Sequence, residues 1–363
     1  MNKLAVVLAF AFATGAVHAQ PAATPPAPSG PAPTGLVVGS GNFYSPIVAN
    51  LEDAIAFYRA VGFEFQGEPA NADANLPLRQ MFGLPDAKLR YQIGRAPGIQ
   101  GGVEIIEISG AGGDRLDLTM QDPGSVMLAV VVRDIDQTLA RVKALGAPVV
   151  TRSGKPVVIA QGGLRAVVVK DPAGHFVELL QPATAPATQP GTGDVRNVWV
   201  RHTVANLDHA VALYRDALGF GPQLHLVNSA TVADALDLNG GSAPVHYDSL
   251  ASVADVLGVP DGTQWRFAQV KVPTSGLPIE LIEFKGARRP APPDIADPGA
   301  TRIQLRVANI DAAVAALVQA GGTFISTGGK PLDLPAGNRS LKVGVVRDPD
   351  GLFVVLIDTP PAQ

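Results

Sequence analysis

The chain contains no cysteine and few charged residues. Of its 363 residues, 17% are charged, 6% are aromatic and none is cysteine. The lack of cysteine excludes disulfides, thiolate metal sites and the lipid attachment point of a bacterial lipoprotein. The formal net charge is -4 and no run of Lys and Arg occurs, which excludes the basic surface typical of nucleic-acid-binding proteins. Hydrophobic residues make up 47% of the chain, enough for large cores in two domains of about 100–200 residues each.

The first nineteen residues have the pattern of a signal peptide. Lys3 gives a positive start, an apolar run from Leu4 to Ala13 is too short to cross a bilayer, and Val17-His18-Ala19 offers small residues for cleavage. We therefore predict cleavage before Gln20, a periplasmic or secreted protein and no membrane contact after cleavage. An uncleaved membrane anchor is the alternative.

Two proline-rich segments divide the rest of the chain. Residues 20–35 and 183–194 are rich in Pro, Ala and Thr, and such segments bury too little apolar surface to fold. We interpret the first as disordered and the second as a linker between domains at 36–182 and 195–360.

The two domains are copies of each other. Five blocks recur in the same order, which indicates duplication: Val48 to Leu51 and Val204 to Leu207, Phe82 to Asp86 and Leu257 to Asp261, Val103 to Glu107 and Ile279 to Glu283, Gly154 to Pro156 and Gly329 to Pro331, and Asp171 to Gly174 and Asp348 to Gly351.

Each copy is itself double. A β-rich run ends four times at a residue that can cap a helix, namely Asn50, Asp134, Asn206 and Asn309. Apolar residues at helical spacing follow, as from Ile135 to Leu145, and Gly146 closes that helix. Strand-like runs such as 166–169 and 176–180 come next. The pattern predicts a strand, a helix and about three strands, four times over.

These motifs resemble the vicinal oxygen chelate superfamily, which includes glyoxalase I, the extradiol dioxygenases and the bleomycin and fosfomycin resistance proteins. The family pattern stands here as Val48 to Phe63 and Asp171 to Leu179. The resemblance implies an α+β fold of two glyoxalase-like domains, each of two paired βαβββ modules around a cleft. We expect consecutive modules to pair, although pairing of the first with the fourth is also possible in this family.

The resemblance also implies where a divalent metal would bind. Its ligands would come from the first and last strands of each module, usually His and Glu. Counting back from the motif gives Phe43, Glu104, Met127 and Glu178 in the first domain, and Trp199, Glu280, Arg302 and Val355 in the second. No position holds His. Glu104 and Glu178 remain weak candidates for metal binding, and Arg302 is expected beside Glu280 in place of a metal. We therefore predict no cofactor, with a divalent metal as the less favoured possibility.

Strand alternation then predicts what each cleft contains. In the first domain, Glu104 and Glu178 would share an apolar cleft and could act as a catalytic acid–base pair, or could be remnants of an ancestral site. In the second domain the predicted ligand-binding residues would suit an anionic, partly aromatic molecule; they are Trp199, Arg201, Thr203, Glu280, Arg302, Gln304 and Arg306.

Histidines do not supply the missing ligands. We expect His175 and His202 to face away from the clefts and His209 to be exposed, whereas His225 and His246 could enter a cleft.

Three functions fit these features. The first is an exported, metal-free protein that binds a small molecule. The second is a metal-dependent lyase, isomerase or dioxygenase with a rebuilt carboxylate site. The third is a structural protein with closed clefts. The sequence favours the first.

Overall fold

A computed structural model describes residues 35–99, 101–159, 163–183, 193–222, 248–336 and 339–358. The predicted signal peptide, His225, His246 and most of the two proline-rich segments lie outside these ranges. Among the described residues, no helix has the length and apolar character needed to cross a bilayer.

The first half of the chain contains two modules of the predicted kind, preceded by a short strand β1 (Val37–Ser40). Module 1 consists of β2 (Ser45–Val48), α1 (Leu51–Val61), β3 (Glu64–Phe65), β4 (Ala70–Asn71), α2 (Leu76–Met81), β5 (Lys88–Arg95) and β6 (Gly102–Ser109). Module 2 consists of β7 (Val126–Val132), α3 (Ile135–Ala144), β8 (Val157–Val158), β9 (Arg165–Lys170) and β10 (Phe176–Gln181).

The second half repeats this order. Module 3 consists of β11 (Val195–Thr203), α4 (Leu207–Val211), which continues as the π-helix η1 (Ala212–Ala217), then β12 (Gly221–Pro222), α6 (Ala251–Leu257), β13 (Trp265–Lys271) and β14 (Pro278–Phe284). Module 4 consists of β15 (Thr301–Val307), α7 (Ile310–Gln319), β16 (Thr323–Phe324), β17 (Leu332–Ala336), β18 (Arg339–Arg347) and β19 (Phe353–Asp358).

The four predicted caps start the four main helices. The side chains of Asn50, Asp134, Asn206 and Asn309 each accept a hydrogen bond from the backbone N–H three residues later. A second acceptor comes from the last strand of the same module: Glu107 accepts from Leu51 N at 2.9 Å, and Glu283 accepts from Leu207 N at 2.7 Å. These bonds satisfy helix N–H groups that have no partner within the helix. The repeated motif therefore encodes a repeated helix start.

Modules pair across the two halves of the chain and not within them. In the eleven-stranded sheet, β2 of module 1 lies antiparallel to β15 of module 4, with Ser45 opposite Arg302. In the eight-stranded sheet, β7 of module 2 lies antiparallel to β11 of module 3, with Trp199 opposite Ala129. We call these the outer-module sheet and the inner-module sheet. The expectation that consecutive modules pair was wrong, because all four first strands carry the same motif and their sequence does not specify a partner.

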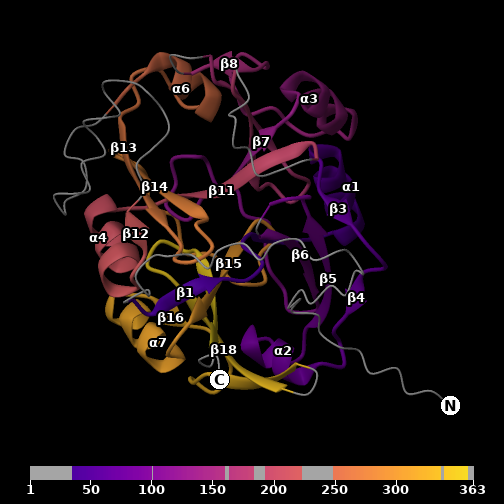
Figure 1. Ribbon diagram of the computed structural model, residues 1–363, viewed down its shortest axis with the longest axis vertical. Helices are drawn as coiled ribbons and strands as arrows, with labels where there is room; N and C mark the ends of the chain where they lie inside the picture. The colour runs from indigo at the N-terminus through magenta and orange to yellow at the C-terminus, as the bar shows by residue number, and fades with distance from the viewer. Residues whose placement is uncertain are drawn as a thin grey trace, which may run out of the picture.

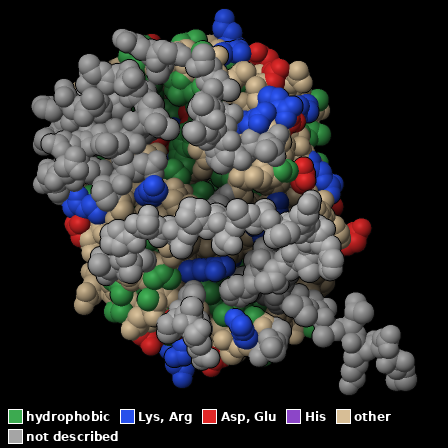
Figure 2. Space-filling model, viewed as in Figure 1, with side chains coloured by type: hydrophobic (Ala, Val, Ile, Leu, Met, Phe, Trp, Pro, Cys, Tyr) green, Lys and Arg blue, Asp and Glu red, His purple; other side chains and the backbone are tan. Residues whose placement is uncertain are grey.

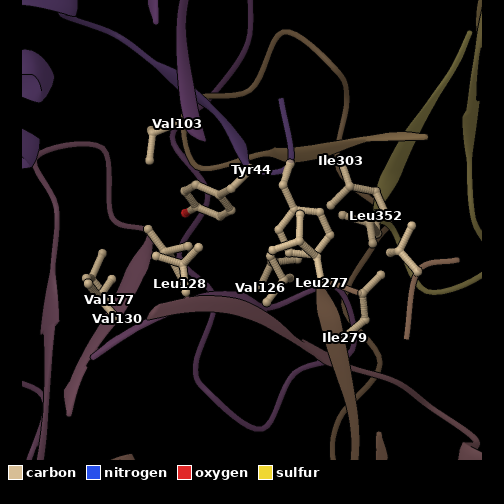
Figure 3. Packing of buried hydrophobic residues seen from close by; sticks show 14 of the residues in the cluster. Tyr44, Val103, Val126, Leu128, Val130, Val177, Leu277, Ile279, Ile303 and Leu352 are labelled. Carbon is tan, nitrogen blue, oxygen red and sulfur yellow. The ribbon is translucent and has the colours of Figure 1, made fainter. Parts of the chain in front are cut away.

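Consecutive modules contact each other through their helices. Figure 1 shows α1 beside α3 on one side of the molecule and α4 and α7 on the other. In the first contact, Arg141 Nε of α3 donates to the carbonyl of Ala60 in α1 at 2.8 Å. One core of buried residues runs behind both sheets (Figure 3), where Leu128 of β7, Ile279 of β14 and Ile303 of β15 belong to the same cluster. The two halves are therefore joined both by strands and by a common core.

A short helix links the two modules of each sheet near its rim. In the inner-module sheet, Thr151 Oγ1 of module 2 donates to the carbonyl of Val256 in α6 at 2.9 Å. In the outer-module sheet, Ser326 Oγ of module 4 donates to the carbonyl of Met81 in α2 at 2.7 Å. A separate hydrophobic cluster lies beneath each helix, on the concave face of the sheet. It is on these two faces that the candidate site residues lie.

Candidate functional site

Strand register identifies four equivalent positions, one in each module. Arg201 lies opposite Glu280, Ala129 opposite Glu178, and Gln304 opposite Val355. In module 1, Ile47 pairs with Ile106, which brings Ser45 level with Glu104. The first-strand positions are therefore Ser45, Ala129, Arg201 and Gln304.

These positions lie two residues after the predicted Phe43, Met127, Trp199 and Arg302. A shift of two residues keeps a side chain on the same face of a strand but moves it along the sheet, so alternation alone could not reveal the error. Phe43 is a further exception. Phe43 lies in the segment before β2, and this segment is not paired with β15 as β2 is. Its side chain packs in the core behind the sheets.

The inner-module sheet holds one arginine between two glutamates. Arg201 Nε donates to Glu280 Oε2 at 2.7 Å, and its terminal nitrogen Nη2 lies 3.4 Å from Glu178 Oε2. Gln269 Nε2 donates to the other oxygen of Glu280 at 3.2 Å. Both glutamates are almost fully buried, whereas the Arg201 side chain is 17% exposed. We call these four residues, Glu178, Arg201, Gln269 and Glu280, the inner-module centre.

Trp199 adds an aromatic surface next to this centre. It lies two residues before Arg201 on β11, opposite Ala129, and is partly exposed. Its ring packs against the hydrophobic cluster of the concave face, which also includes Phe176 and Trp265. Its indole Nε1 has no hydrogen-bond partner among the described residues. In Figure 2, hydrophobic side chains gather at the middle of the upper half of the view, the half that contains the inner-module sheet.

The outer-module sheet carries a different arrangement, the outer-module centre, made of Ser45, Glu104, Arg302 and Gln304. Glu104 Oε2 accepts from Ser45 Oγ and from Arg302 Nη2, both at 3.3 Å, and from the Gln304 amide. The Arg302 guanidinium lies over the ring of Phe82, 4.5 Å from its centroid. Arg302 and Gln304 are each 1% exposed, so this centre is closed.

The segment before β2 helps to close the outer-module centre. Asn42 N donates to Gln304 Oε1 at 3.1 Å, and Gly41 N donates to the Gln304 carbonyl at 3.1 Å. A Cβ at Gly41 would lie 2.5 Å from Gln304 Oε1. Any larger residue at this position would force the Gln304 side chain to shift. In the inner-module sheet, β11 keeps a continuous register with β7 from Asn197 to His202.

The two arginines respond differently to burial. Burial lowers the pKa of Arg302 to about 10, because Glu104 only partly offsets the loss of water. Burial also opposes the charge of Arg201, but Glu178 and Glu280 together outweigh it and hold the pKa of Arg201 above its usual value. Two carboxylates thus fix Arg201 as a permanent cation.

The predicted residues are divided between two centres. Glu104 and Glu178 belong to different sheets and cannot form the proposed acid–base pair. Arg302 contacts Glu104 and not Glu280, the partner expected for it. The predicted ligand-binding set is likewise split. Trp199, Arg201 and Glu280 lie on the inner-module sheet, and Arg302, Gln304 and Arg306 lie on the outer-module sheet.

Thr203 and Arg306 lie away from both centres. Thr203 Oγ1 donates to the carbonyl of Met120 at 2.9 Å and is buried, so its role is structural. Arg306 lies near the end of β15, opposite Gly39 of β1. Sequence analysis missed Gln269 and Ser45 as partners of the glutamates. Each could have been identified by its position beside a glutamate on the neighbouring strand. That position is known only once the register of the strands is known.

His175 and His202 are buried and form hydrogen bonds within the protein. His175 Nδ1 lies 2.9 Å from Asp171 Oδ2, and Nε2 lies 3.0 Å from the carbonyl of Ala300. His202 Nε2 lies 3.1 Å from Asp348 Oδ2. Tyrosine hydroxyls donate to the same two carboxylates, from Tyr58 at 3.2 Å and Tyr214 at 2.7 Å.

A divalent metal does not fit either centre. The described residues contain no group of three or more His, Cys, Asp or Glu side chains placed to hold a metal ion. At the inner-module centre a guanidinium already binds both carboxylates, and Ala129 offers no ligand atom. At the outer-module centre Val355 stands where a second carboxylate would be needed. The arrangement suits hydrogen bonding and charge pairing.

Comparisons with known proteins support the resemblance. Residues 42–179 match the model of the Glyoxalase/Bleomycin resistance protein/Dioxygenase superfamily. The fold is similar to glyoxalase I from Zea mays, at 15% identity and a TM-score of 0.53 over 87% of this chain and 91% of that one. A variant of the Zea mays enzyme gives 17% identity and a TM-score of 0.54 over the same shares. No curated protein sequence matches significantly. Residues 42–179 therefore match the Glyoxalase/Bleomycin resistance protein/Dioxygenase superfamily, which is the vicinal oxygen chelate superfamily that the motifs resemble, and the fold of most of the chain is similar to that of glyoxalase I.

Proposed function

We propose that this protein is a metal-independent member of its superfamily that binds a small molecule at the inner-module centre. The observation that carries the proposal is the unpartnered indole N–H of Trp199 beside the partly exposed side chain of Arg201. A buried donor without an acceptor costs free energy, which a ligand acceptor would recover. The outer-module centre has no comparable access, since its arginine and glutamine are almost completely buried.

The charges of the centre favour a neutral or cationic aromatic ligand. Glu178, Glu280 and Arg201 together carry two negative charges and one positive charge, a formal sum of -1. The guanidinium that was expected to attract an anion is already paired with two carboxylates. Trp199 offers a ring face for stacking or for a cation–π contact. Because the indole N–H of Trp199 needs an acceptor, we favour a neutral aromatic alcohol over the anionic ligand that the sequence had suggested.

The alternative of a metal-dependent lyase, isomerase or dioxygenase is less well supported. Such an enzyme would need carboxylates free to bind a metal, whereas Glu178 and Glu280 hold Arg201 and Glu104 holds Arg302. The same contacts offer no free carboxylate for proton transfer.

Saturation-transfer NMR with three matched probes tests the proposal. We expect the strongest signal from benzyl alcohol, because its hydroxyl can accept from the indole N–H; protonated benzylamine has no acceptor, and the formal charge of the centre disfavours benzoate. Trp199→Phe removes the indole donor and should abolish the preference for benzyl alcohol over benzylamine. Trp265→Phe is the matched control, since Trp265 is a buried tryptophan of the same sheet. Preferential binding of benzoate or benzylamine, or an unchanged response in Trp199→Phe, would overturn the proposal.

We also propose that the protein is exported, on the evidence of its first nineteen residues. Residues after this segment then constitute a periplasmic or secreted protein.

A further inference from the structure

The two glutamates of the inner-module centre approach the same cation from opposite sides. Glu280 lies on β14 and Glu178 on β10, and β11 and β7 run between these strands. Arg201 projects from β11 and reaches both carboxylates. Its single charge balances only one of the two negative charges. The pair of glutamates is thus electrostatically suited to a divalent cation, although an arginine fills the space.

We propose that the Arg201 guanidinium takes the place of a divalent metal ion, and that the inner-module centre is a latent metal site. Arg201 itself occupies the first-strand position opposite Glu280, where the resemblance implies a metal-binding histidine. The native protein rejects a metal at this point because Arg201 stays charged at every relevant pH. A metal could enter only by displacing the guanidinium from both carboxylates.

Replacing Arg201 by histidine should open the site. The variant would offer an imidazole nitrogen and the carboxylates of Glu178 and Glu280. Imidazole and carboxylate ligands together suit ions such as Mn²⁺, Zn²⁺ and Ni²⁺. The Gln269 amide, now bonded to Glu280 at 3.2 Å, would orient that carboxylate from behind.

The outer-module centre provides a matched control within the same chain. Arg302 there contacts one carboxylate, Glu104, and Val355 occupies the place equivalent to Glu178. Arg302→His would therefore create a site with one carboxylate and one imidazole. Two protein ligands of this kind should not hold a divalent ion tightly, because catalytic sites ordinarily use at least three.

Titration of the full chain with Mn²⁺, followed by electron paramagnetic resonance, tests the proposal. We expect Arg201→His to bind one equivalent at least about tenfold more tightly than the native protein, and Glu178→Gln in that background to lose about tenfold or more, the usual effect of altering a metal's surroundings. Arg302→His should bind no better than the native protein. Circular dichroism confirms folding, and Arg201→Asp, which also gives three protein ligands, replaces Arg201→His if the latter fails to fold.

Two results would overturn the proposal. One is a native protein that binds one equivalent of Mn²⁺ and loses it on Glu178→Gln, because the guanidinium would then not exclude the metal. The other is a folded Arg201→His, or a folded Arg201→Asp in its place, that binds Mn²⁺ no better than Arg302→His does. The first result would also contradict the metal independence of the proposed function, whereas the second leaves the binding of aromatic probes untouched, so the two failures can be distinguished.

Discussion

Arg302 and Glu104 form a buried ion pair between the first and the last module of the chain, with the guanidinium Nη2 3.3 Å from the carboxylate Oε2. The residues are 198 positions apart in sequence. The pair lies in the outer-module sheet, which is one of the two sheets formed between the halves of the chain. The free energy of unfolding of its variants therefore reports on the stability of that sheet.

Removal of one member of this pair should cost more than removal of both. We expect Arg302→Met and Glu104→Gln each to lower the free energy of unfolding by about 3 kcal/mol, because each leaves a buried polar or charged group without its partner. The double variant should lose less than either single variant, because it leaves neither group without its partner. Urea unfolding of the four proteins measures the coupling. Additive losses would show that the pair does not act as a unit.

Cutting the linker should not separate the halves. A protease site placed between Ala183 and Gly193 allows cleavage after folding, and a denaturing gel confirms the cut. We expect the fragments to elute as one species in size-exclusion chromatography, because β2–β15 and β7–β11 are both formed between halves. Two independently eluting fragments would mean that consecutive modules pair after all.

The contribution of His175 to stability should depend on pH. Both ring nitrogens face acceptors, Asp171 and the Ala300 carbonyl, so the imidazolium form satisfies both. Burial opposes that charge, but Asp171 outweighs burial and raises the pKa of His175 above 6.5. Burial likewise opposes the Asp171 charge, yet His175 holds the pKa of Asp171 below 3.8.

The raised pKa of His175 and the lowered pKa of Asp171 determine how the stability of the protein changes with pH. The His175 contribution is complete below pH 6.5 and is lost as pH rises through its raised pKa, while the Asp171 contribution is lost only as pH falls below 3.8. His175→Ala should therefore cost about 2 kcal/mol near pH 6 and less near pH 9. Chemical denaturation at both pH values measures this. The exposed His209 is the control, and equal losses at both pH values would contradict the assignment.

Signal cleavage can be checked by mass. Expression in a bacterium, followed by intact-mass measurement of the periplasmic fraction, should give a chain that begins at Gln20. Ala19→Arg places a large charged residue at the cleavage position and should leave the full-length chain uncleaved. A native chain that retains its first nineteen residues would support the membrane-anchor alternative.

Sequence by itself determined the family resemblance, the α+β class and the repeated module. These depend on local signals: Asn50, Asp134, Asn206 and Asn309 each cap a helix by bonding to a backbone N–H three residues away. Side-chain alternation also placed Trp199 and Arg201 on one face of a strand. Such features are fixed by spacings within a few residues, and so they can be read from the sequence.

Tertiary structure decided which modules share a sheet, and hence which residues meet. The four first strands carry one motif, so local sequence cannot distinguish module 4 from module 2 as the partner of module 1. Pairing across the halves puts Arg302 on Glu104 and Arg201 between Glu178 and Glu280. Side-chain alternation along a strand tells which face of the sheet a residue lies on, but not which residue of the neighbouring strand it lies opposite. Only the register between paired strands decides that.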